Sequence, residues 1–145
     1  MEVSFHTTVE QNFNLDEMIA RLEEANGKQA EAGLFGGFAA DKAMWQEYGT
    51  SRGIPARPFL RNTMYENGSK WSRKAASGVL QVFEGGLSTT TLLSQLGTQM
   101  VDDIRQTINA GNFVPLAPQT VARKGSSRPL IDTGEMYGAI THKES

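Results

Sequence analysis

The sequence predicts an α+β fold in which a small antiparallel sheet packs against one shorter and two long helices, with long loops. Apolar residues recur at helical spacing between Pro58 and Gly85 and again between Ser88 and Gly111, which predicts the two long helices. Apolar and polar residues alternate over residues 3–9, which is typical of a half-buried strand. Helical and strand patterns in one short chain favour a mixed fold.

The chain has 145 residues, which predicts a single domain spanning residues 1–145. It contains no cysteine, so neither a disulfide framework nor a thiolate metal site is possible. No apolar run reaches the length of a membrane span. We therefore expect a soluble protein that contacts no membrane and carries no cofactor.

The first helix is predicted to start after Asn14 and to stop at Asn26-Gly27. Glu17 stands three residues after Asn14, in an arrangement that resembles a capping box. The outer face of this helix is expected to be acidic, with Asp16, Glu23 and Glu24. Together with the strand over residues 3–9, this helix forms the predicted N-terminal part of the fold.

A short strand is predicted over residues 30–35, followed by a turn in the glycine-rich stretch that ends at Gly37. That stretch lacks the spacing of a nucleotide-binding fingerprint. Asp41 is predicted to cap a short helix that runs through Glu47. The chain would then enter the segment around which we expect the molecule to be organised.

The first long helix is expected to have an irregularity at Asn67-Gly68, and the second is expected to be capped by Ser88. Gly97 lies on the apolar stripe of the second helix, where it would let a neighbouring helix approach closely. The stripes predicted to face the core are Leu60, Met64, Trp71, Ala75, Val79 and Phe83 in the first helix and Leu92, Leu93, Leu96, Met100, Val101, Ile104 and Ile108 in the second.

Residues 112–130 form an acid-free, proline-bearing segment that we expect to be an extended basic loop. Its cations, Arg123, Lys124 and Arg128, are predicted to meet acidic groups of a neighbouring molecule. A helical turn is possible around residues 119–122. A last strand is predicted at residues 139–142, pairing into the same sheet as the strands at 3–9 and 30–35.

The elbow, residues 45–61, is stiffened by Pro55 and Pro58, whose rings fix the backbone angle φ. Gly49 and Gly53 permit backbone angles that other residues avoid. No acidic residue occurs between Thr50 and Arg61, whereas three arginines do. The elbow is therefore predicted to be rigid and basic.

The elbow also resembles the signature E-[FY]-G-T followed by I-P-x-R-P-F-[LM]-R of tailed-bacteriophage virion morphogenesis proteins, the neck and tail-completion proteins. Here the matching words run from Glu47 to Thr50 and from Ile54 to Arg61. The likeness continues through residues 33–36, 115–125 and 129–136, in the order of that family. This resemblance covers most of the chain after the first helix.

The resemblance implies a structural virion protein that forms a ring at the head–tail junction, in a neck, tail-completion or tail-terminator role. It implies assembly in the cytoplasm of the bacterial host, with a homo-oligomeric ring, a hexamer being favoured. The expected neighbours are head-connector and tail-tube proteins, and DNA would pass through the ring without sequence-specific binding. A minor capsid or head-closure role is the alternative within the same family.

The charge pattern is uneven, with nine acidic and three basic residues in positions 1–50 but six basic and one acidic in positions 51–74. Such a distribution can orient subunits head to tail. A nucleic-acid-binding protein is the alternative from another class. That alternative would use Arg52, Arg57, Arg61, Arg73 and Lys74.

The residues expected to contact another subunit or a partner are Glu47, Thr50, Arg52, Arg57, Phe59, Arg61, Arg123, Lys124 and Arg128. The residues expected to shape the motifs are Gly49, Pro55, Pro58, Asp132, Thr133 and Gly134. We predict in particular that Arg57 anchors an intersubunit contact and that its replacement spares the fold of the monomer.

Enzymatic chemistry is poorly supported by the sequence. Asp132-Thr133-Gly134 resembles the catalytic turn of retroviral-type aspartic proteases, but too little chain follows it to complete that fold. His6 and His142 have no closely spaced carboxylates with which to build a metal site or a catalytic set. We expect Asp132 to be structural, capping the turn that follows it.

Overall fold

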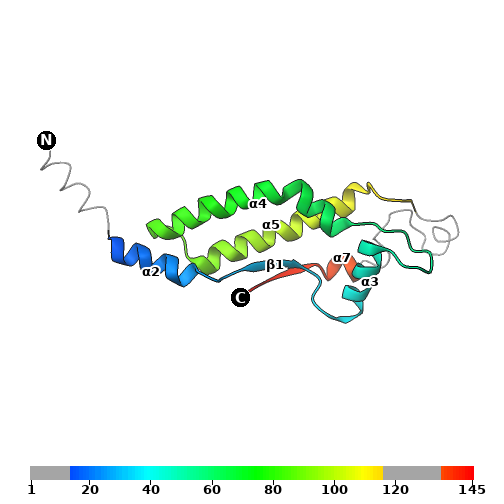
Figure 1. Ribbon diagram of the computed structural model, residues 1–145, viewed down its shortest axis with the longest axis horizontal. Helices are drawn as coiled ribbons and strands as arrows, with labels where there is room; N and C mark the ends of the chain where they lie inside the picture. Colours follow the sequence, from blue (N-terminus) through cyan, green and yellow to red (C-terminus); the bar gives the residue numbers. More distant parts are fainter. Residues whose placement is uncertain (1–13, 116–134) are drawn as a thin grey trace, which may run out of the picture.

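The computed structural model describes residues 14–115 and 135–145, and it has the α+β architecture that the sequence predicts. Two long helices run side by side along the length of the molecule, and a two-stranded sheet lies against one of them (Figure 1). The helices and strands are α2 (Leu15–Ala25), β1 (Ala30–Gly33), α3 (Gly37–Tyr48), α4 (Phe59–Glu84), α5 (Thr89–Ala110), α7 (Glu135–Gly138) and β2 (Thr141–Glu144).

Helix α2 begins as predicted, because the side chain of Asn14 accepts a hydrogen bond from the backbone N–H of Glu17 at 3.2 Å. It packs on α4, not on the sheet that it was expected to cover. Met18 is its buried residue, and Arg21 donates a hydrogen bond to the carbonyl of Phe83 at 3.3 Å. Helix α2 is therefore attached to the C-terminal end of α4.

Helices α4 and α5 approach closely because small residues line their contact. A Cβ at Gly78 of α4 would lie 2.1 Å from a methyl carbon of Leu92 in α5. Nearer the other end of α4, the buried hydroxyl of Thr63 hydrogen-bonds the hydroxyl of Thr107 at 2.7 Å and the carbonyl of Phe59 at 2.6 Å. Helix α4 continues through Asn67-Gly68, where a kink was predicted.

A buried carboxylate also joins these two helices. Asp103 of α5 accepts hydrogen bonds from Lys70 Nζ at 2.8 Å, from Trp71 Nε1 at 2.6 Å and from Gln99 Nε2 at 3.2 Å. Burial alone would raise the pKa of Asp103, but these hydrogen bonds outweigh burial and hold its pKa below the ordinary value. The negative charge is thus fully compensated inside the helix pair.

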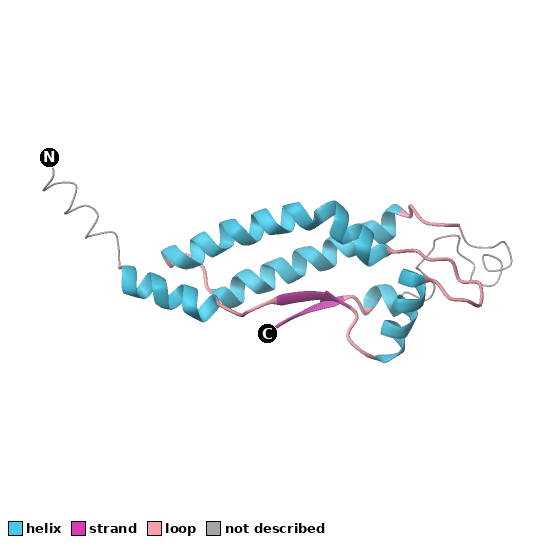
Figure 2. Ribbon diagram, in the orientation of Figure 1, coloured by secondary structure: helices cyan, strands magenta, loops and turns pink. Residues whose placement is uncertain are grey.

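The sheet consists of β1 and β2, paired antiparallel with Ala32 opposite His142 (Figure 2). Both strands pack on α5. The ring of His142 lies directly over Gly97, where a Cβ would fall 2.5 Å from Nδ1. Gly97 therefore admits a strand side chain and not the neighbouring helix that the sequence analysis expected.

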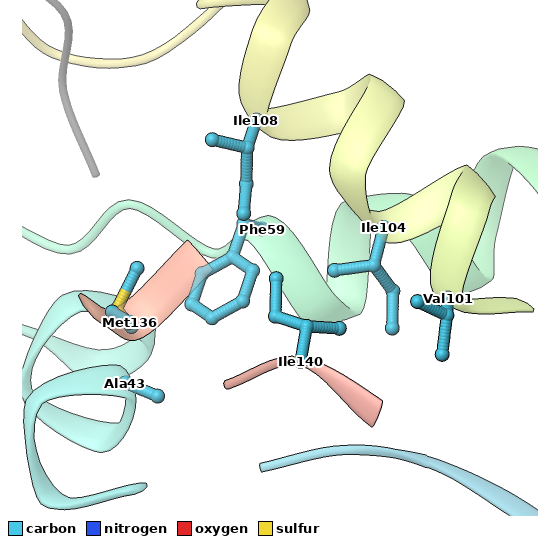
Figure 3. Packing of buried hydrophobic residues seen from close by; sticks show 7 residues of the cluster. All are labelled: Ala43, Phe59, Val101, Ile104, Ile108, Met136 and Ile140. Carbon is cyan, nitrogen blue, oxygen red and sulfur yellow. The ribbon is translucent and has the colours of Figure 1, made fainter. Parts of the chain in front are cut away.

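The hydrophobic core lies where α5, the start of α4, α3 and the C-terminal segment meet (Figure 3). Phe59 is fully buried there, and Ile140 and Ile108 are each 2% exposed. The remaining members of this cluster are Ala43, Val101, Ile104 and Met136. The core is therefore at the end of the molecule where α3 is attached.

The structure differs from the prediction in four places, the first being β1, which ends at Gly33 and not at residue 35. Helix α3 begins at Gly37, so Asp41 lies within the helix and does not cap it. Strand β2 spans Thr141–Glu144, two residues later than predicted, because α7 occupies the chain up to Gly138. Helix α4 also buries a different face from the one predicted, since Met64 and Val79 are exposed. The strand predicted over residues 3–9 and the turn at 119–122 lie outside the described residues.

Candidate interaction surface at the elbow

The elbow connects α3 to α4, and Glu47 provides the tightest link between them. Helix α4 has no side-chain cap of its own at Pro58, so its first N–H groups need another acceptor. The Glu47 carboxylate accepts from the backbone N–H of Leu60 at 2.9 Å and of Arg61 at 3.0 Å. A negative charge at this position also interacts favourably with the helix dipole. Glu47 therefore caps α4 from the preceding helix.

Arg57 holds the elbow from inside. Its side chain, 4% exposed, donates to the carbonyl oxygens of Val114 at 2.8 Å and Pro115 at 3.2 Å and to Oε1 of Gln46 at 3.2 Å. Burial lowers the pKa of Arg57 from its ordinary value, because the charged form loses hydration. The guanidinium thus joins the elbow, α3 and the segment that follows α5.

Gly49 is required by the path of the elbow. Its φ is +73°, and a Cβ there would lie 2.8 Å from the carbonyl oxygen of Ile54. Thr50 closes the adjoining turn, because its backbone N–H donates to Ile54 O at 2.9 Å and its hydroxyl accepts from Ile54 N at 3.3 Å. These contacts give the elbow the defined shape that its glycines and prolines predict.

These contacts correct the roles expected for three residues. Phe59, Glu47 and Arg57 are at most 4% exposed, so they have no surface left for a second subunit. Thr50 is half-buried, so its predicted contact stays a prediction. The prediction that Arg57 anchors an intersubunit contact is replaced by a role within the chain.

Two of the predicted contact residues remain on the surface. Arg52 is exposed, and the side chain of Arg61 is 52% exposed although its Nε donates to Glu47 Oε1 at 2.8 Å. The expected contacts Arg123, Lys124 and Arg128 lie outside the described residues. The same applies to the motif residues Asp132, Thr133 and Gly134.

The outer side of α3 carries a cluster of aromatic rings that the sequence analysis did not single out. Phe38 and Trp45 meet edge to face, with ring centroids 5.9 Å apart. Lys42 Nζ lies 4.6 Å from the Phe38 ring centroid, and the Arg61 guanidinium lies 4.8 Å from that of Tyr48. Exposed aromatic and arginine side chains of this kind are typical of protein interfaces. The seven-residue spacing of Phe38 and Trp45 was the available sequence signal.

Among the side chains of residues 14–115 and 135–145, no three histidine, aspartate or glutamate residues are grouped so that they could hold a metal ion. Within the same ranges, no helix has the length and apolar character needed to cross a membrane.

Comparison of the chain with protein-family models, with curated proteins and with solved structures found no match.

Proposed function

We propose that this chain is a structural protein of a tailed-bacteriophage virion that assembles into a ring at the head–tail junction, in a neck or tail-completion role. The observation that carries the proposal is the ordered set of motifs that resembles this family, from Gly33 to Met136. Glu47, Gly49, Arg57 and Phe59 belong to these motifs, and each has a specific task in the elbow.

Exposed apolar side chains support self-association. Large apolar residues with exposed fractions above 40% occur on α2, α3 and α4, among them Leu15, Met44 and Met64. Large exposed apolar side chains that gather into patches mark interaction sites in proteins that work in assemblies. In a ring of identical subunits, each copy would bury such surface against its neighbours.

The nucleic-acid alternative is disfavoured by two of its five cations. The Arg57 guanidinium is buried among carbonyl oxygens, and Arg61 pairs with Glu47. Three of the five cations remain available, namely Arg52, Arg73 and Lys74. Three cations are few for a protein that binds phosphates mainly through charge.

The proposal is tested by electron microscopy of the purified protein, alone and after mixing with purified tails or DNA-filled heads of the parent phage. We expect rings, and we expect them to bind the head-proximal end of the tail or the portal vertex of the head. Binding only at other sites on the capsid would favour the minor capsid role. Absence of binding to either particle would reject the proposed function.

A further inference from the structure

Helix α3 turns an apolar side to the solvent. Phe38, Met44, Trp45 and Tyr48 fall on one arc of the helix, and they are 57%, 61%, 42% and 65% exposed. The opposite side carries the buried Ala43 and Glu47. We call these four residues the α3 face. Side chains of this size rarely stand together on a free surface, which indicates that another protein covers them.

A second uncovered apolar surface lies between α2 and α4. Helix α2 is strongly amphipathic in sequence, yet Leu15, Ile19 and Leu22 are 55%, 43% and 38% exposed. Ile19 and Leu22 line an open apolar hollow of about 410 Å³ together with Val79 of α4. We call this hollow, with its rim, the α2/α4 groove. Within the described residues, the packing of α2 on α4 leaves these three side chains partly exposed.

The two surfaces lie at opposite ends of the molecule and carry opposite charge. Figure 1 shows α2 at one end and α3 at the other, with the length of α4 and α5 between them. Residues 14–25 hold four acidic side chains and one basic one. The exposed or half-buried charges beside the α3 face are the cations Lys42, Arg52 and Arg61 and the carboxylates Asp41 and Glu135, of which Glu135 pairs with Lys42. Glu23 lines the groove itself. Complementary charge of this kind selects a partner and orients it.

We propose that the α3 face of one copy docks into the α2/α4 groove of a second copy of this chain. The apolar residues of each surface would cover those of the other. The acidic rim of the groove would face the exposed Arg52, with Lys42 and Arg61 beside it, whose charges Glu135 and Glu47 partly offset. A contact between two different surfaces is heterologous, so it repeats from copy to copy and closes into a ring when the rotation between copies permits. Only this closure rests on the proposed function; the docking does not.

The decisive experiment uses two variants that each damage one surface. Met44→Asp places a charge on the α3 face and leaves the groove intact, whereas Ile19→Asp does the reverse. Both positions are exposed, so both variants are expected to keep the wild-type circular dichroism spectrum. In size-exclusion chromatography with light scattering, wild type is expected to form oligomers and each variant alone to remain monomeric.

An equimolar mixture of the two variants should then form a species of twice the monomer mass and nothing larger. In that pair the intact groove of Met44→Asp holds the intact α3 face of Ile19→Asp, and the two remaining surfaces are both damaged. Self-association of Ile19→Asp alone would overturn the proposal, because the α3 face would then pair with itself or with another site. Wild type that stays monomeric at high concentration would also overturn it.

Disulfide trapping gives a second measurement that does not depend on a disruptive charge. Since the chain has no cysteine, every disulfide that forms must join introduced thiols. Under oxidation, a chain with both Met44→Cys and Ile19→Cys should give a ladder of linked oligomers. The matched control combines Met44→Cys with Ser77→Cys, an exposed position about 200° around α4 from Val79. An equal ladder in the control would overturn the assigned contact.

The possible failures can be told apart. If wild type forms rings that bind tails or heads, but both variants do so as well, the proposed function stands and the assigned contact is wrong. If the mixed pair forms as expected but wild-type oligomers bind neither particle, the contact stands and the proposed function is wrong.

Discussion

Several polar residues of this protein are buried and have structural roles that their residue types alone do not reveal. Arg57 is the clearest case, because an arginine in a basic loop is usually a surface residue. Here its guanidinium is surrounded by carbonyl oxygens from the segment after α5 and by Gln46. Its contribution should therefore appear in the stability of the single chain.

We expect Arg57→Ala to lower the free energy of unfolding by about 2–4 kcal/mol, because it removes the three charge-assisted hydrogen bonds of a buried guanidinium. Urea unfolding followed by circular dichroism measures the change. The matched control is Arg52→Ala in the same loop, where the exposed side chain should contribute less than about 0.5 kcal/mol. Equal stabilities of the two variants would show that Arg57 is not an anchor.

Asp103 should make stability depend on pH. Its pKa is lowered in the folded chain, so its contribution is fully present above the ordinary value of 3.8 and is lost as pH falls through the lower pKa of the folded state. Asp103→Asn should be less stable than wild type at neutral pH, and this difference should shrink in acid. Unfolding curves of both proteins from neutral to strongly acidic pH measure the trend. A difference that is constant with pH would contradict it.

At the scale of elements, two glycines in long helices have opposite roles. Gly97 of α5 lies under His142, and a Cβ there would be 2.9 Å from the Cβ of that residue, which cannot move without moving β2. At Gly68 of α4, apart from its chain neighbours and the nearby backbone of its own helix, no atom lies within 4 Å of where a Cβ would be. The same substitution should therefore have opposite effects at these two sites.

Gly97→Ala is expected to destabilise the chain by roughly 1–3 kcal/mol, because the strand pair must shift away from α5. Gly68→Ala should stabilise it by up to about 1 kcal/mol, since alanine favours a helix. Thermal unfolding of both variants measures the two signs. Hydrogen exchange should also show faster exchange of the β2 amides in Gly97→Ala alone, and unchanged β2 amides would argue against the assigned contact.

At the scale of the whole molecule, an elongated body presents apolar surfaces of different charge at its two ends. An assembly held by apolar burial and oriented by charge should persist at high salt. Binding to phosphates should instead weaken steeply as salt is added. The two proposals for this chain therefore make different predictions about ionic strength.

We expect high salt to slow the association of subunits by about tenfold while leaving the fraction assembled at equilibrium nearly unchanged. Light scattering after a concentration jump measures the rate, and sedimentation measures the equilibrium. Anisotropy of labelled duplex DNA provides the parallel measurement for the alternative. Tight DNA binding that weakens steeply with salt, together with no assembly, would favour the nucleic-acid-binding protein.

Periodicity and caps in the sequence are sufficient to place most of the local structure. Asn14, Ser88, Gly85 and Gly111 mark helix ends, and the structure has caps at these positions, because capping depends on a few neighbouring residues. The fold class follows from the same patterns. The exception is α3, whose start at Gly37 precedes the cap signal at Asp41.

Tertiary structure alone decided which side of each element is buried and what the elbow residues do. Helix α4 buries Thr63 and Gly78 and exposes Met64, because close approach to α5 favours small residues over an apolar stripe. Glu47 and Arg57 have partners 11 to 58 residues away in the chain. Local patterns determine where helices begin and end, whereas burial depends on contacts between distant segments, which no local pattern contains.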